Sequence, residues 1–147
     1  MITWFQIVFI VVAGLAVSIP VTLKRRKSLS KYWARACTGS QWKRRFPIAS
    51  KSEIRAFLDL FVGAFLFRRK HRLSFSPDDQ VMDVYRASYP PGWSLADAME
   101  LEFLTMRIQK TYGVDIVALW RKDITLGDLF AFTQNRSAEA SSEQNGS

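Results

Sequence analysis

The side chains best suited to chemistry gather in a short segment around residue 97. Three carboxylates, Asp97, Glu100 and Glu102, follow one another closely, and the hydroxyl of Ser94 precedes them. Paired carboxylates can act as general acid and base, and a serine hydroxyl can act as a nucleophile or carry a covalent group. Carboxylates on one helix face can also contact a basic partner. The segment therefore allows both catalytic and binding roles.

Outside this segment, few residues suit catalysis. Cys37 is the only cysteine, so neither an intrachain disulfide nor a cysteine metal cluster can form. His71 is the only histidine, and it lies within a cationic run that favours a solvated surface position. No Ser/His/Asp set, phosphate-binding glycine loop or metal-ligand spacing is present. We therefore expect a protein that is not an enzyme and that binds no cofactor or metal.

The acidic segment is expected to belong to a helix. Ser94 and Asp97 form a capping-box pattern, and Gly113 is typical of a helix end, so the sequence predicts a helix ending near Tyr112. Apolar residues recur along it at helical spacing. We expect its core-facing stripe to hold Leu101, Leu104, Ile108 and Tyr112, widened by Leu95, Met99, Phe103 and Met106.

Other capping patterns predict further helices. Ser50 and Glu53 precede an apolar stripe over residues 54–67, which is too short to cross a bilayer. Ser76-Pro-Asp-Asp79 predicts a short helical turn, and Thr125-Leu-Gly-Asp128 predicts a last short helix. No long alternation typical of strands occurs. The sequence thus predicts an all-α fold, a small four-helix bundle over residues 50–134, with a disordered polar tail over residues 135–147.

Charge divides the chain of 147 residues into three regions. Residues 1–23 hold no charged side chain, residues 24–72 hold 15 Lys/Arg against 2 acidic residues, and residues 73–147 hold 6 against 11. The first region is long enough and apolar enough to predict a transmembrane helix. A cleaved signal peptide is disfavoured because basic residues follow the apolar run instead of preceding it. Since basic flanks stay cytoplasmic, we expect a single-pass bacterial inner-membrane protein with its N-terminus outside and residues 24–147 in the cytoplasm.

Residues 24–49 are expected to form a basic amphipathic connector beside the membrane. Leu29, Tyr32, Trp33 and Ala36 share one helix face, which suits the headgroup layer of an anionic leaflet. The predicted membrane-surface residues are Lys24, Arg25, Arg26, Lys27, Lys31, Trp33 and Arg35. A solvated linker and a nucleic-acid surface, in which Trp33, Tyr32 and Trp42 stack on bases, are the alternatives.

The helices from residue 50 to residue 134 resemble the acyl carrier protein family. The resemblance rests on DAMELEFLTMRIQKTYGVDI, residues 97–116, and on DITLGDLFAF, residues 123–132. In that family Asp-Ser-Leu opens the second helix, an aromatic-x-x-acid-Ile segment closes it, and a Thr-x-x-Asp-Leu-like segment opens the last helix. The chain is most similar to small, uncharacterised bacterial carrier-like proteins that have Asp-Ala in place of Asp-Ser.

The resemblance implies a carrier without its cargo site. Counted back from Tyr112 by the family's spacing, Ala98 stands where carriers have the phosphopantetheine serine, and an alanine methyl cannot form that bond. Ser94 is the nearest hydroxyl, but it lies too early and is explained by helix capping. By the same resemblance, Asp97, Glu100 and Glu102 correspond to the acids that partner enzymes contact; a solvated helix face is the alternative.

Three functions remain open from the sequence. The favoured one is a membrane-anchored, carrier-like docking or regulatory module for enzymes of lipid or envelope metabolism. The second is a true membrane-tethered acyl carrier modified with 4'-phosphopantetheine at Ser94. The third is a small membrane-surface or stress protein that binds anionic lipid. A protein partner and anionic membrane lipid are expected, and nucleic acid is not.

Overall fold

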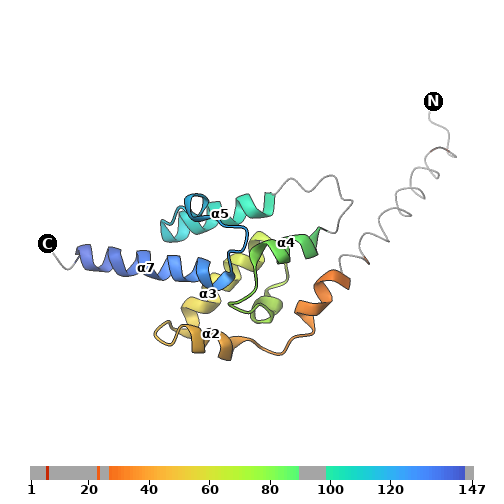
Figure 1. Ribbon diagram of the computed structural model, residues 1–147, viewed down its shortest axis with the longest axis horizontal. Helices are drawn as coiled ribbons and strands as arrows, with labels where there is room; N and C mark the ends of the chain where they lie inside the picture. The colour runs from red at the N-terminus through yellow and green to blue at the C-terminus, as the bar shows by residue number, and fades with distance from the viewer. Residues whose placement is uncertain (1–5, 7–22, 24–26, 90–98, 145–147) are drawn as a thin grey trace.

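The computed structural model describes residues 6, 23, 27–89 and 99–144, and these residues are helical with connecting loops. Residues 27–33 are helical and precede the labelled elements (Figure 1). In chain order these are α2 (Gly39–Arg45), α3 (Lys51–Ala64), the 3-10 helix η1 (Arg69–Ser74), α4 (Val81–Ser88), α5 (Met99–Tyr112), α6 (Ile116–Leu119) and α7 (Leu126–Gln144).

The all-α prediction is confirmed over the described residues. They contain no strand, and one isolated antiparallel bridge joins Gln80 to Thr125. No helix within the described ranges combines the length and the apolar character that a membrane crossing needs. The predicted transmembrane segment, residues 1–23, lies outside these ranges except for Gln6 and Leu23.

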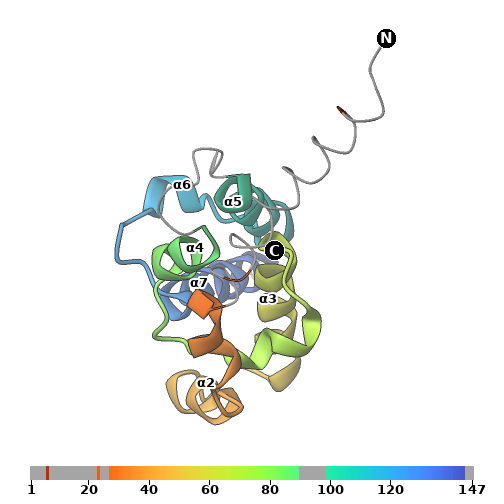
Figure 2. The same cartoon turned by 90° about the vertical axis from the view of Figure 1, so that its right-hand side faces the viewer.

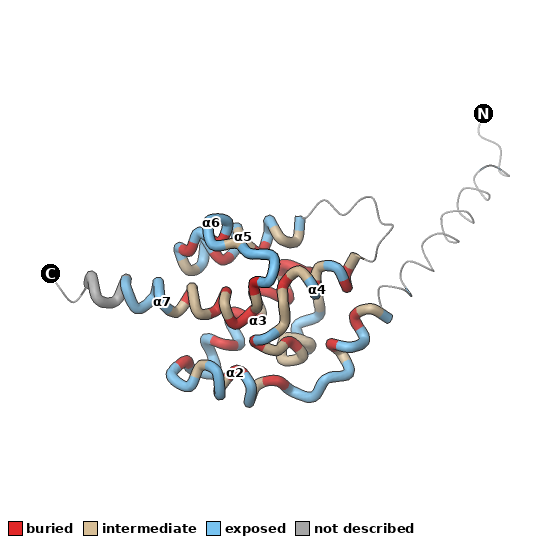
Figure 3. Tube along the Cα trace, viewed as in Figure 1, coloured by how far each residue is buried: buried red, intermediate tan, exposed pale blue. Residues whose placement is uncertain are grey.

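Helix α3 forms the centre of the core and begins as predicted. The Ser50 hydroxyl accepts from the Glu53 backbone N–H at 3.1 Å, and Glu53 accepts from the Ser50 N–H at 2.6 Å. Hydrogen bonding to the side chain and backbone of Ser50 holds the pKa of Glu53 below its usual range. Phe57, Leu58 and Phe61 are fully buried along the helix. The reciprocal cap thus starts the helix that the other elements cover (Figures 1 and 3).

The C-terminal end of α3 has an unusual backbone. Leu66 adopts a φ of 54°, a left-handed conformation that leucine rarely takes. The Phe67 N–H donates to the Val62 carbonyl at 2.8 Å, and the Leu66 N–H donates to the Gly63 carbonyl at 3.4 Å. This pair of bonds is the Schellman closure, in which glycine usually holds the left-handed position. The closure turns Leu66 outward, with 84% of its surface exposed.

Helix α5 packs against α3 and is followed by the short helix α6. Helix α5 contacts α3, α6 and α7, and it ends at Tyr112, as predicted. Gly113 follows with a φ of 69°. Asp115 then caps α6 by accepting from the backbone N–H groups of Val117 and Ala118. Figure 2 shows α5 and α6 side by side at one end of the molecule.

Two loops before α4 and α7 pair with each other through backbone hydrogen bonds. The Gly127 N–H donates to the Pro77 carbonyl at 2.7 Å, and the Val81 N–H donates to the Ile124 carbonyl at 3.0 Å. Thr125 and Asp128 cap each other's backbone N–H groups, which confirms the predicted cap. These bonds hold the starts of α4 and α7 together.

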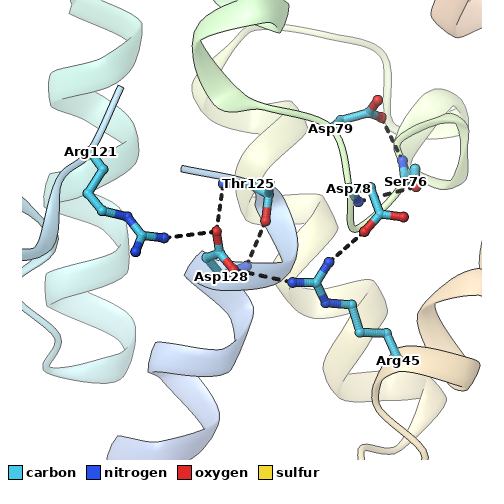
Figure 4. A network of polar contacts seen from close by, with 7 residues as sticks. All are labelled: Arg45, Ser76, Asp78, Asp79, Arg121, Thr125 and Asp128. Atoms are coloured by element: carbon cyan, nitrogen blue, oxygen red, sulfur yellow. Dashed lines mark hydrogen bonds and ion pairs between the residues drawn. The ribbon is translucent and has the colours of Figure 1, made fainter. Parts of the chain in front are cut away.

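One arginine of α2 joins this pair of loops through its side chain. The Arg45 guanidinium bonds Asp78 at 2.5 Å and Asp128 at 3.2 Å, and Arg121 reaches Asp128 from the other side. The Asp128 carboxylate therefore serves both as a helix cap and as the meeting point of two guanidinium groups (Figure 4). Such a network fixes α2 against the start of α7.

The prediction for Ser76–Asp79 is only partly right. Asp79 accepts from the Ser76 N–H at 2.7 Å, and the Asp78 N–H donates to the Ser76 hydroxyl, so the motif forms a turn. Helix α4 begins later, at Val81. The predicted cap at Ser76 is wrong, because the N-cap of α4 is Gln80 and the Pro77 carbonyl accepts from the Gly127 N–H outside any helix.

The prediction that residues 24–49 form a separate connector is wrong from residue 27 onward. Leu29, Tyr32 and Trp42 belong to the same buried core as α3. The Trp42 indole N–H donates to the Phe75 carbonyl at 2.8 Å, and the Thr38 hydroxyl bonds that same carbonyl at 2.7 Å. The apolar face that was expected to meet lipid is therefore covered by protein, and the folded domain starts before residue 50.

The disordered tail predicted for residues 135–147 is also wrong in part. Helix α7 continues from Leu126 through Gln144. Its first two turns are buried, at Leu126, Leu129, Phe130 and Thr133, while residues 135–139 are exposed (Figure 3). A helix can continue past its packed turns because each added residue forms another backbone hydrogen bond. Polar composition alone did not reveal this extension.

Candidate docking surface

Helix α5 presents one face to the core and another to solvent. Leu104 and Ile108 are fully buried. Met99, Phe103 and Met106, which lie four and three residues apart, remain 46%, 44% and 59% exposed. This spacing puts them on a common stripe of the helix, separate from the buried one. The prediction that these three residues widen the core face is therefore wrong.

The three acids predicted to contact a partner have different surroundings. Glu100 is half-buried and accepts a hydrogen bond from the Tyr89 hydroxyl. Glu102 is exposed and forms no ion pair among the described residues. Asp97 lies outside the described residues. Of the two acids that the structure describes, Glu102 is the one available to a partner, and it lies one residue before Phe103.

Helix α6 adds apolar surface beside α5. Val117 is 71% exposed and Leu119 is 41% exposed, although Ile116, the first residue of α6, is buried. The two helices are in contact. Exposed apolar side chains on neighbouring helices are typical of interaction sites. We call Glu102, Phe103, Met106, Val117 and Leu119 the α5–α6 face.

The phosphopantetheine attachment site that the acyl carrier resemblance implies lies outside the described residues. Ser94, Asp97 and Ala98 fall in residues 90–98, outside the described ranges. The alternative phosphopantetheine site at Ser94 and the alanine at the motif position thus stay predictions. The helix that follows them is observed from Met99 onward.

The predicted membrane-surface residues divide into three groups. Lys24, Arg25 and Arg26 lie outside the described residues. Lys27 and Lys31 are exposed, whereas Arg35 Nη1 donates to both carboxylate oxygens of Asp79, at 2.7 and 2.6 Å. Trp33 packs inward instead of toward solvent, as shown by its ring contacts.

Trp33 lies against the segment that links α3 to η1. Its ring centroid is 5.3 Å from that of Phe67 and 4.3 Å from that of His71. Consequently, His71 is half-buried and not the solvated residue that the sequence suggested. Burial, followed by the neighbouring charges of Lys70 and Arg68, lowers the pKa of His71. His71 therefore serves as a packing partner of Trp33.

A polar hollow of about 770 Å³ lies between α2 and the turn at residues 76–79. Arg35, Arg44 and Arg45 line it together with Asp78 and Asp79. Two of the three guanidinium groups bond these carboxylates, so most of the charge in the hollow is internally compensated. Within the described part of the chain, no three His, Cys, Asp or Glu residues are grouped as metal ligands.

Two tyrosines, the buried Tyr32 and the half-buried Tyr112, pack in or against the core. Burial, together with Asp79 and Asp83, raises the pKa of Tyr32 to about 12. Burial also raises the pKa of Tyr112. Both phenols stay neutral at physiological pH, because their pKa values lie above the ordinary value near 10.

Sequence reasoning missed Phe103, Met106, Val117 and Leu119 as surface residues. A helical signal was present, since Met99, Phe103 and Met106 repeat at four and three residues and form a stripe of their own. Two apolar stripes on one helix cannot both face a small core unless the helix is enclosed. A comparison of the two stripes would have shown that one of them is exposed. It would not have shown which of the two stripes that is.

The chain was compared with protein families, with curated proteins and with solved structures. None of the three comparisons produced a match.

Proposed function

We propose that this chain is a single-pass inner-membrane protein that presents a cytoplasmic, acyl-carrier-like domain as a non-catalytic docking or regulatory module. Its partners would be enzymes of lipid or envelope metabolism. The observation that carries the proposal is the α5–α6 face, where Phe103 and Met106 are exposed beside Glu102. The apolar residues 1–23 support the anchor.

The chemistry of the face fits a protein partner. Methionine and phenylalanine adapt to apolar pockets, and such residues are enriched where proteins bind one another. One carboxylate at the edge of an apolar stripe can orient a basic partner without adding much affinity. The proposed partner is therefore a protein with an apolar groove bordered by basic side chains.

Site-specific photo-crosslinking of the full-length chain in cells tests this proposal. A benzoylphenylalanine at position 103 should form a discrete protein adduct, and Met106→Lys should reduce its yield severalfold. The same probe at Arg55, an exposed residue of α3, is the matched control. The docking proposal would be refuted if the probe at position 103 formed no protein adduct, or if the probe at position 55 formed adducts in equal yield.

Mass spectrometry distinguishes the rival carrier function. The full-length chain would be co-expressed with a phosphopantetheinyl transferase, and the mass of the peptide containing Ser94 would be measured. The docking proposal expects an unmodified peptide. A phosphopantetheine adduct on Ser94 would refute the docking proposal and show that the chain is an acyl carrier.

A further inference from the structure

We propose that residues 66–70, the basic loop, are a docking surface for anionic lipid headgroups that holds this domain against the membrane. This inference rests on the proposed membrane anchoring. The apolar face predicted to meet lipid in residues 24–49 packs against the core. The proposed lipid-binding surface is therefore a different one, which the fold leaves exposed. The loop combines an exposed leucine with three exposed cations.

Leu66 is the apolar tip of the loop. The Schellman closure of α3 holds it in a left-handed conformation with 84% of its surface exposed. A leucine has no intrinsic preference for that conformation, and no core contact there offsets it. Exposure of an apolar side chain in a strained backbone conformation points to a function outside the fold.

Cations surround this tip. Arg68, Arg69 and Lys70 are all exposed. Arg69 bonds Asp59 at 2.7 Å, whereas Arg68 and Lys70 form no ion pair among the described residues. Two uncompensated cations beside an aliphatic tip match a surface of phosphate groups above acyl chains.

Packing places the basic loop next to the chain that leads to the proposed anchor. Trp33, at the end of the helical residues 27–33, contacts Phe67 and His71. The exposed Lys27 and Lys31 lie on that same helix. Residues 24–27 are themselves basic and follow the apolar segment 1–23 directly. The loop is therefore held close to where the chain would leave the bilayer.

Lipid suits this surface better than nucleic acid. Non-specific nucleic-acid binding needs aromatic rings that are free to stack on bases. Tyr32 and Trp42 are 1% and 0% exposed, and Trp33 is engaged with Phe67 and His71. The exposed apolar residue of the loop is aliphatic, and an aliphatic side chain partitions into the headgroup boundary but does not stack.

An environment-sensitive probe at the tip tests the inference on the full-length chain. Cys37→Ser removes the natural cysteine, Leu66→Cys introduces a site for a nitrobenzoxadiazole label, and the protein is reconstituted into nanodiscs. We expect a blue shift and a gain in emission when phosphatidylglycerol is added to phosphatidylcholine discs. Arg68→Glu with Lys70→Glu should abolish that difference.

Two controls accompany the measurement. A label at Lys122, an exposed residue that belongs to neither proposed surface, should not respond to phosphatidylglycerol. Lys51→Glu with Arg55→Glu reverses the same number of charges at exposed positions of α3 and should leave the response at residue 66 intact. Circular dichroism checks that each variant is folded.

The outcomes separate the inference from the proposed function. A chain that does not remain with the discs would overturn both. A chain held in the discs whose label at residue 66 responds equally in both lipids, or is unaffected by the Arg68/Lys70 reversal, would overturn the basic loop alone. A response to added RNA in phosphatidylcholine discs, without one to phosphatidylglycerol, would assign the surface to nucleic acid instead.

Discussion

At the scale of single residues, backbone conformation decides which side chains reach the surface. Leu66 follows the buried Ala64 and Phe65 in an apolar run, so its sequence context favours burial. The helix closure overrides that context and turns it outward. Hydrophobic periodicity carries no information about where a helix stops, and the exposure of Leu66 therefore could not be predicted.

Replacing Leu66 with glycine should stabilise the domain. A left-handed conformation costs an L-residue about 1–2 kcal/mol, whereas glycine adopts it freely. Glycine also increases the conformational entropy of the unfolded chain, which lowers the free energy of unfolding by about 0.4–1 kcal/mol. We expect Leu66→Gly to raise the free energy of unfolding by up to about 1 kcal/mol, measured by urea denaturation.

Gly113 provides the reverse experiment. Its φ is 69°, and an added Cβ would meet no atom within 4 Å. Gly113→Ala should therefore lower the free energy of unfolding by up to about 1 kcal/mol, because backbone strain of about 1–2 kcal/mol exceeds the unfolded-state entropy that alanine removes. If both substitutions changed stability in the same direction, the conformational explanation for Leu66 would be refuted.

At the scale of elements, the paired loops before α4 and α7 depend on a glycine. An alanine Cβ at Gly127 would lie 2.8 Å from the Pro77 carbonyl oxygen and 2.9 Å from Arg45 Cζ. The first contact involves backbone, so the loops must separate to relieve it. Gly127→Ala should cost about 1–3 kcal/mol of unfolding free energy, as other overpacked sites do. Thermal or urea unfolding measures the loss.

Gly39 is the matched control for this substitution. A Cβ there would lie 3.5 Å from the Cys37 sulfur, an ordinary contact. Gly39 is the first residue of α2, so the alanine also suits the helix. We expect Gly39→Ala to leave stability nearly unchanged. An equal loss at both glycines would contradict the role of the Pro77 contact.

The elements show which sequence signals are dependable. The caps at Ser50 and Thr125 were predicted correctly because capping involves residues only three apart. The apolar face of Leu29 and Tyr32 was also recognised, but its covering was assigned to lipid instead of to the core. Periodicity shows that a helix has an apolar face, yet the covering comes from Phe75, far along the chain.

At the scale of the whole molecule, the folded unit is larger than the predicted residues 50–134. Leu29, Tyr32 and Trp42 contribute large side chains to the core. Removing one buried aromatic side chain costs about 3–5 kcal/mol, against a total stability of about 5–15 kcal/mol. We therefore expect a fragment of residues 50–147 to be unfolded, as measured by near-ultraviolet circular dichroism.

A fragment of residues 27–147 is the control for this truncation. It keeps the residues that pack against α3 and the Trp42 bond to the Phe75 carbonyl. It should unfold cooperatively with heat or urea. Cooperative unfolding of the shorter fragment with similar stability would show that the first two helical segments are dispensable.

The early start of the folded domain limits how far it can move from a membrane. If residues 1–23 cross the bilayer as proposed, only residues 24–26 separate that crossing from the helical residues 27–33. Fully extended, this link spans no more than about 14 Å. A module on so short a tether cannot search the cytoplasm, and it samples a thin layer beside the lipid at high effective concentration. Only proteins that are themselves present in that layer can then reach α5 and act as partners.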